Sequence, residues 1–250
     1  MENNVQNRKI PKMIIFDYGH TLTYEEKWDG VKGEKALLKY AVSNKNNLMP
    51  EQVCEFADDL FLTTNAGRRN GLEVHEHQFQ KFLYEYLQIK VNLPPVKLEE
   101  IFWDNASPAH AMPYMIETLD YLRKNKIRTG VISNISFSGK ALKNRLNRIF
   151  PDNRFEFIIA SSEYIFRKPN KMLFELALKK ANLAANDVWY CGDSVEFDVS
   201  GASSAGIFPV WYESEIESWY IERGKQKIPE CEHLHITDWR ELIDVLEGLK

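Results

Sequence analysis

IIFDYGHTL, residues 14–22, is an apolar run near the start of the chain that is broken by the acid Asp17. Far along the chain YCGDS, residues 190–194, ends another apolar run in the same way, at Asp193. Ligands of an open parallel sheet bind beyond the carboxyl ends of its strands, so these two acids are expected to converge there. Two such carboxylates, with no His or Cys ligand set beside them, indicate a site for a hard cation such as Mg²⁺.

The rest of the chain supplies the strands and helices of such a sheet. Apolar, β-branched and aromatic runs predict five buried strands, at Met13–Phe16, Arg128–Ser133, Phe155–Ala160, 188–191 and 207–211. Helical patterns follow them near 139–148, 171–181 and 199–205. A last amphipathic helix carries Trp239, Leu242, Ile243, Leu246 and Leu249. This alternation predicts an α/β fold, a doubly wound parallel sheet with helices on both faces.

Between the first two strands, residues 24–107 show only helical periodicity, and we expect them to form an inserted all-helical cap domain. Residues 1–23 and 108–250 would then form the α/β core domain. The segments that flank the insertion, 23–33 and 107–113, are polar with two glycines or marked by proline, so they are predicted hinges.

Composition narrows the class of function. The 250 residues include 44% hydrophobic ones, enough for a sizeable core, and the net charge of -4 comes without a basic block. We therefore expect a small-molecule partner, with no nucleic acid and no membrane. The polar N-terminus lacks the apolar run of a signal peptide, which predicts a cytoplasmic protein, and Cys54, Cys191 and Cys231 are expected to be reduced thiols.

With these residues placed, the chain resembles the haloacid dehalogenase superfamily of hydrolases, in the phosphatase-like branch with a helical C1-type cap after the first strand. The resemblance rests on four motifs in order: residues 17–21, residues 132–134, residues 167–169, and residues 192–194 followed by Asp198. It implies a Rossmann-like core and a phosphohydrolase that uses Mg²⁺.

The resemblance also implies a role for each motif residue. Asp17 would be the nucleophile that forms an aspartyl phosphate, and Lys168 would offset the charge of Asp17 and of the phosphate. Mg²⁺ would be held by Asp17, Asp193 and the backbone carbonyl of Gly19. Ser133 would bind the phosphoryl oxygens.

Two further motif residues have supporting roles. The backbone amide of Asn134 would join Ser133 and Lys168 in binding the phosphoryl oxygens. Asp198 would lie behind the metal site and orient Lys168 or a metal-bound water.

One position departs from the family pattern. Gly19 stands where the family's phosphatases carry the Asp that protonates the leaving oxygen and later activates water. General acid-base catalysis contributes about 10²- to 10⁴-fold, so we expect a slower enzyme that keeps its nucleophile and metal. The neighbouring His20 is a possible acid or base, but it occupies a family glycine position, and His tolerates a left-handed backbone better than most side chains.

Specificity is not readable from the sequence. Tyr18 and the cap residues Arg68, Arg69, His75, His77 and Trp103 are candidates for substrate contact.

We expect an enzyme, a Mg²⁺-dependent phosphohydrolase of small phosphorylated metabolites. One alternative is a non-catalytic protein that binds phosphate or a metabolite. Another is a phosphonatase-like carbon-phosphorus hydrolase, which needs a cap lysine such as Lys32, Lys35, Lys39 or Lys45.

Overall fold

The computed structural model describes residue 5, residues 8–217 and residues 226–250. Residues 1–4 and 6–7, part of the polar stretch on which the expected location rests, lie outside them. Among the described helices, none has the length and apolar character needed to cross a membrane.

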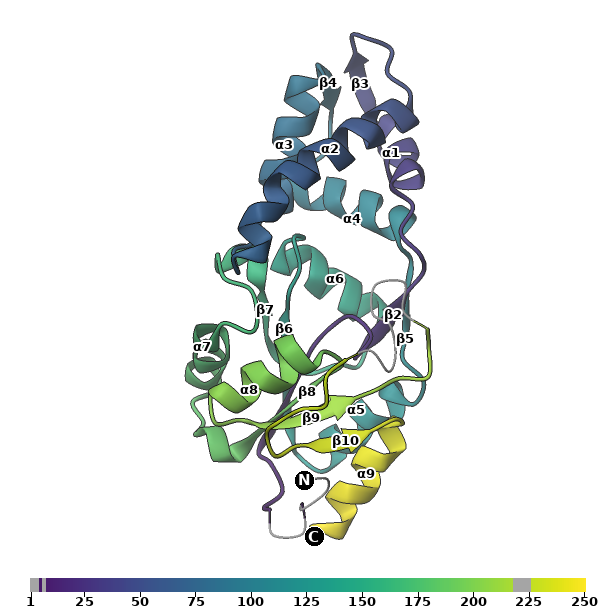
Figure 1. The fold of residues 1–250 in the computed structure, drawn as a ribbon. Helices are drawn as coiled ribbons and strands as arrows, with labels where there is room; N and C mark the ends of the chain where they lie inside the picture. The colour runs from purple at the N-terminus through teal and green to yellow at the C-terminus, as the bar shows by residue number, and fades with distance from the viewer. Residues whose placement is uncertain (1–4, 6–7, 218–225) are drawn as a thin grey trace.

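The centre of the molecule is a six-stranded parallel sheet with the order β10-β9-β8-β1-β6-β7 (Figure 1). Its strands are β1 (Met13–Phe16), β6 (Arg128–Ser133), β7 (Phe155–Ala160), β8 (Val188–Gly192), β9 (Phe208–Tyr212) and β10 (Leu234–Ile236). Successive side chains of β1 point to opposite faces, so Ile14 and Phe16 pack in one core and Met13 and Ile15 in another. Both faces are therefore apolar, and both are covered by helices.

Each face carries its own set of helices. The core around Ile14 and Phe16 is closed by α5 (Met115–Lys124), α6 (Gly139–Ile149) and α9 (Trp239–Gly248). The core around Met13 and Ile15 is closed by α7 (Lys171–Ala181) and α8 (Gly201–Ser204). The predicted doubly wound α/β fold is confirmed. The helix expected at 199–205 begins earlier, in the π-helical turn η3 (Val195–Ser200), and two short turns, η1 (Ser161–Glu163) and η2 (Ala185–Asp187), complete the core.

Four helices gather at one end of the molecule, beyond the carboxyl ends of the central strands (Figure 1). They are α1 (Gly30–Leu38), α2 (Pro50–Arg69), α3 (Glu76–Tyr86) and α4 (Pro95–Ala106), and we call them the cap helices. The prediction that this segment is helical throughout is wrong at β3 (Ala41–Asn44) and β4 (Ile89–Val91), which pair antiparallel. Strands this short carry too few residues for an alternating pattern to stand out from the helical one.

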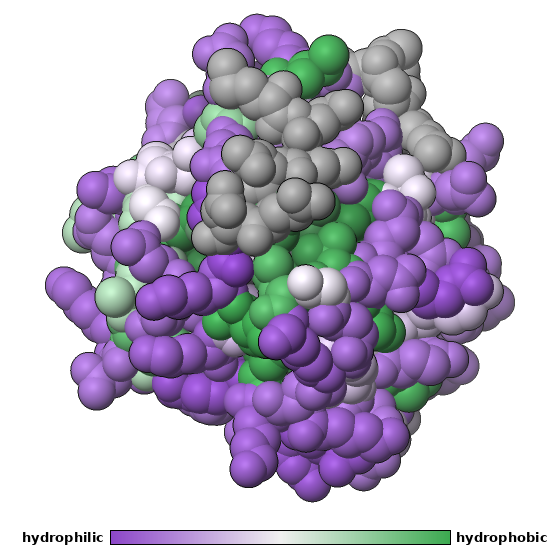
Figure 2. Space-filling view, turned by 90° about the horizontal axis from the view of Figure 1, so that it is seen from below, coloured by the Kyte–Doolittle hydropathy of each residue, from purple (hydrophilic) through white to green (hydrophobic). Residues whose placement is uncertain are grey.

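The chain passes between the sheet and the cap helices along a two-stranded ribbon. Strand β2 (Thr23–Glu25) pairs antiparallel with β5 (Ala109–Ala111), so that Thr23 lies opposite Ala111. This ribbon lies in the segments predicted as hinges, and the predicted domain boundary at residue 24 falls inside β2. At the other end of the molecule, seen from below, the described surface is mostly hydrophilic around an apolar strip (Figure 2).

Candidate active site

The two acids that end the apolar runs lie together in the structure. Strands β1 and β8 are paired neighbours with Phe16 opposite Cys191, so Asp17 and Asp193 follow at almost the same level of the sheet. Asp198, from η3, completes the group. Each of the three buried residues offers a carboxylate oxygen, and these oxygens lie within 4.8 Å of one another. The parallel pairing of β1 and β8 thus brings together two acids that are far apart in the sequence.

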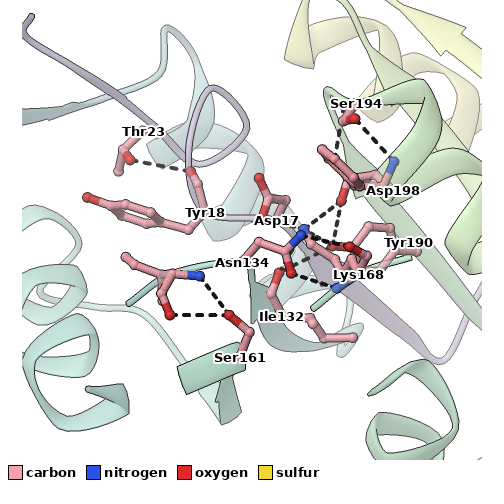
Figure 3. A network of polar contacts seen from close by, with 12 residues as sticks. Asp17, Tyr18, Thr23, Ile132, Asn134, Ser161, Lys168, Tyr190, Ser194 and Asp198 are labelled. Carbon is pink, nitrogen blue, oxygen red and sulfur yellow. Dashed lines mark hydrogen bonds and ion pairs between the residues drawn. The ribbon is translucent and has the colours of Figure 1, made fainter. Parts of the chain in front are cut away.

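Lys168 joins this cluster from the loop that follows β7. Its Nζ lies 2.6 Å from Oδ1 of Asp17 and 2.6 Å from Oδ1 of Asp198, and it donates to the Tyr190 hydroxyl at 3.0 Å (Figure 3). The side chain is only 2% exposed. Burial alone would lower the pKa of Lys168, but the two carboxylates raise it overall. Lys168 is therefore a fixed positive charge between two acids.

Asp198 uses both of its oxygens within the protein. Oδ1 accepts from Lys168 and from the Tyr190 hydroxyl at 3.1 Å, and Oδ2 accepts from the backbone amide of Ser194 at 3.0 Å. The close approach to β8 depends on Gly192, because a Cβ there would lie 2.3 Å from the Cγ of Asp198. Asp198 is thus placed to position Lys168.

The charges of the cluster do not balance by themselves. Burial, opposed by Lys168, raises the pKa of Asp17 to about 6, and burial with the nearby charges of Asp198 and Asp17 raises the pKa of Asp193 well above its usual value. Among the described residues, Asp193 makes no ion pair with a basic side chain. The cluster contains three carboxylates and one lysine, and each carboxylate offers hard oxygen ligands. This excess of negative charge fits a divalent cation such as Mg²⁺. Asp17 and Asp193 are the residues that would hold it.

The second motif ends β6, the strand on the other side of β1. Ser133 is buried there. The side chain of Asn134 donates from Nδ2 to the carbonyl of Lys168 at 3.0 Å and accepts from the Lys168 amide at 2.6 Å (Figure 3). The side chain of Asn134 therefore orients the loop that carries Lys168.

Gly19 and His20 have different environments. Gly19 lines the cavity described below, whereas His20 is not among the lining residues and is buried. His20 has φ of 50°, in the left-handed region that His tolerates. Burial lowers the pKa of His20 to about 4, so the imidazole is neutral at pH 7 and is a poor proton donor. These features favour accommodation of the backbone over acid catalysis.

A cavity of about 830 Å³ runs from this cluster into the cap helices. On the core side it is lined by Asp17, Gly19, Ser133, Asn134, Lys168, Asp193 and Asp198. Of the cap candidates, Arg68 and Trp103 line it, and Arg69, His75 and His77 do not. His77 instead pairs with Glu99, its Nε2 lying 2.7 Å from Oε2 of Glu99.

Tyr18 also lines the cavity, but its hydroxyl has a partner. It donates to Oε1 of Glu25 at 2.9 Å, and Nε1 of Trp103 donates to the same oxygen at 3.1 Å. The Trp103 ring stacks on Phe137 with the centroids 4.2 Å apart. These contacts tie α4 to the loop after β1.

The cap meets the core at a second place, after α2. Glu73 has a fully buried side chain that pairs with Arg167 and Arg68 and accepts from the Ser161 hydroxyl at 2.9 Å. The backbone joins as well, since the Arg167 amide donates to Gly71 at 2.8 Å. The residue just before Lys168 is therefore held by the cap.

Sequence reasoning missed several residues of the site. Tyr190 lies within an apolar strand and is indistinguishable there from a core aromatic. The cap residues Glu34, Glu76 and Gln80 line the cavity, yet acids and amides on amphipathic helices usually indicate the solvent face. Only the inward turn of α1 and α3 reveals them.

Comparisons with known proteins agree with this geometry. Residues 69–211 match the family described as haloacid dehalogenase-like hydrolase. Pyrimidine 5'-nucleotidase YjjG of Escherichia coli is 33% identical over 202 residues, 79% of this chain and 84% of that protein. Ribulose-1,5-bisphosphate 5-phosphatase of Halopiger xanaduensis is 23% identical over 235 residues, 90% of this chain and 94% of that protein. The crystal structure of 2-haloacid dehalogenase from Pseudomonas syringae shares the fold, with a TM-score of 0.60 at 21% identity, over 97% of this chain and 100% of that chain.

Proposed function

This chain belongs to the haloacid dehalogenase-like hydrolases, and from that we propose that it is a Mg²⁺-dependent phosphohydrolase of small phosphorylated metabolites. One observation carries the proposal. Asp17 is held at the end of β1 by Lys168 and lies beside Asp193, at the floor of a cavity large enough for a metabolite.

Asp17 is the nucleophile in this proposal. Its ion pair with Lys168 fixes Oδ1 and orients the carboxylate for attack on phosphorus. As the new oxygen-phosphorus bond forms on Asp17, the bond to the leaving oxygen breaks, and an aspartyl phosphate results. Attack of water on that acyl phosphate then returns the Asp17 carboxylate and releases inorganic phosphate.

The surrounding groups offset charge. Ser133 and the backbone amide of Asn134 donate to phosphoryl oxygens, and Lys168 compensates the negative charge of the phosphate. Mg²⁺, held by Asp17, Asp193 and the carbonyl of Gly19, supplies further charge neutralisation when bound. Asp198 and Tyr190 are positioning residues that keep the Lys168 ammonium in place.

The names of two relatives support the substrate class. One of them is named for pyrimidine nucleotides and another for a sugar bisphosphate, so a phosphate monoester of a small metabolite is the common element. Nothing favours carbon-phosphorus hydrolysis. The lysines that it would require, Lys32, Lys35, Lys39 and Lys45, are exposed and outside the cavity lining.

The test is phosphate release from p-nitrophenyl phosphate and from a panel of phosphorylated metabolites, with Mg²⁺ and with a chelator. We expect activity that the chelator removes and that Asp17→Asn, which lacks the nucleophile, reduces by at least about 10³-fold. Calorimetric titration of Mg²⁺ should show weaker binding to Asp193→Ala.

Hydrolysis that survives in Asp17→Asn would contradict the assignment of the nucleophile. If phosphate binds while no substrate is hydrolysed, the non-catalytic alternative is correct.

A further inference from the structure

The cap half of the cavity differs in chemistry from the cluster at its floor. Its aromatic walls come from α2, α3 and α4 and from the segment before α1: Trp28, Phe61, Phe79, Phe102 and Trp103. Among these rings stand the polar side chains of Glu34, Glu76 and Gln80. Flat aromatic walls with a few polar groups are the usual lining of a site for a ring-shaped ligand.

Two of these three polar side chains, those of Glu34 and Gln80, are buried. Glu34 is 2% exposed and its Oε2 accepts from the Tyr84 hydroxyl at 3.0 Å, while Gln80 is 5% exposed. Burial raises the pKa of Glu34 to about 7. Burial also raises the pKa of Glu76 to about 8, with Glu99 and Glu34 adding to the effect and Arg68 opposing it. Near pH 7 the protonated form of both carboxyl groups is therefore well populated, and a protonated carboxylic acid presents one O–H donor and one carbonyl acceptor side by side.

We infer that Glu34, Glu76 and Gln80 recognise the leaving group of the substrate, and that this group is a flat, uncharged ring with hydrogen-bond donors and acceptors on its edge, as in the base of a nucleoside monophosphate. The inference rests on the proposed function for the position of the phosphate. The phosphate lies at Asp17 and the ring lies between the aromatic walls of the cap, with its edge against the two acids and the amide.

The charges of the cavity disfavour a second phosphate at the cap end. Among the described lining residues, the basic ones are Arg68, Arg167 and Lys168. Arg68 and Arg167 pair with Glu73, and Lys168 pairs with Asp17 and Asp198. A bisphosphate would place its second anion against acids, with no uncommitted cation to receive it.

The test compares the kinetics of uridine, cytidine and adenosine monophosphates with those of glycerol 3-phosphate, ribulose 1,5-bisphosphate and phosphocholine. We expect a KM for at least one nucleoside monophosphate that is about tenfold or more below the KM for glycerol 3-phosphate, as one or two buried hydrogen bonds would provide. Glu34→Leu should raise that KM about tenfold or more. Glu34→Gln, which keeps a donor and an acceptor, should raise it about threefold or less.

Glu85→Leu is the matched control, because Glu85 also lies on a cap helix but is 73% exposed. It should change no KM. Calorimetric titration with the preferred nucleoside monophosphate provides a second readout that needs no turnover, and thermal unfolding shows that each variant is folded.

Two results would overturn the inference. If phosphocholine is preferred and Glu34→Gln is as harmful as Glu34→Leu, the acids bind a cation. If glycerol 3-phosphate or the bisphosphate is bound as well as any nucleotide, the cap end does not recognise a ring. Failure of the proposed function would give a different result. p-Nitrophenyl phosphate would then not be hydrolysed, whereas calorimetric titration would still show weaker nucleotide binding in Glu34→Leu if the inference about the cap is correct.

Discussion

At the scale of single residues, Gly19 has the largest chemical consequence. The proposed nucleophile, the lysine and the acids of the proposed metal site are all present, but no side chain projects from the position of Gly19. His20, buried and neutral, offers no proton to a leaving oxygen at pH 7. Leaving groups that depart unprotonated should therefore be hydrolysed much faster than alkyl ones.

Gly19→Asp should restore the missing acid and raise turnover of alkyl phosphates by about 10²-fold, with a smaller effect on p-nitrophenyl phosphate, whose leaving group needs no proton. The backbone conformation of Gly19 permits the change. Among the described glycines, those with positive φ are Gly71 and Gly206, so Gly19 does not occupy the left-handed region that disfavours a side chain. The measurement is kcat for both substrate classes.

Gly19→Asn is the control, since its amide has the size of Asp without a transferable proton. An equal gain in Gly19→Asn would show that the effect is structural. If the parent already hydrolyses alkyl phosphates as fast as p-nitrophenyl phosphate and His20→Ala abolishes this, then His20 is the acid.

At the scale of elements, the junction of β8 and η3 positions Asp198, which pairs with Lys168. The strand ends in a glycine whose missing Cβ makes room for Asp198. We predict that Gly192→Ala displaces Asp198, lowers kcat at least about tenfold and destabilises the protein by about 1–3 kcal/mol. Denaturant unfolding and kcat measure the two effects.

Gly248→Ala is the comparison for that substitution, because a Cβ at Gly248 meets nothing within 4 Å. It should leave both quantities near those of the parent. Unchanged kcat in Gly192→Ala would contradict the role given to Asp198.

Prediction from sequence succeeded where an element has one dominant pattern. Strands β1, β6 and β7 begin and end at the predicted residues, because buried parallel strands are continuous apolar runs. Strand β10, at Leu234–Ile236, is too short to give such a run. Asp17 and Asp193 were placed together by topology alone, since paired parallel strands end at one edge.

The parts that were not predicted depend on three-dimensional contacts. The inward direction of Glu34 follows from the packing of α1 on α4 and from its hydrogen bond with Tyr84, which lies fifty positions further along the chain. Neither periodicity nor motif spacing in the sequence indicates this contact. Tyr190 is equally hidden, because an aromatic residue in a buried strand has the same pattern with or without a polar partner.

At the scale of the whole molecule, Glu73 links the cap to the loop that carries Lys168. Its carboxylate is buried between Arg167 and Arg68. Glu73→Gln leaves both guanidinium groups without their counter-ion, so we predict that the contact opens about tenfold more often. Hydrogen exchange of residues 71–76 and 164–167 measures this opening, and KM should rise more than kcat falls.

Glu55→Gln removes an exposed acid of α2 and should leave the exchange of both segments unchanged. Equal protection in Glu73→Gln and the parent would show that the ion pairs do not hold the two parts together.

The pairing of β2 with β5 also determines how freely the inserted segment can change in length and sequence. Because Thr23 lies opposite Ala111, the inserted segment leaves the core and returns to it at neighbouring points. The entropy lost on closing a loop grows only with the logarithm of its length, by about 0.6 kcal/mol for each doubling. Insertions and deletions among the cap helices therefore cost the core little. The walls around the outer part of the cavity can diverge in length and sequence while the strand ends that carry Asp17 and Asp193 keep their register.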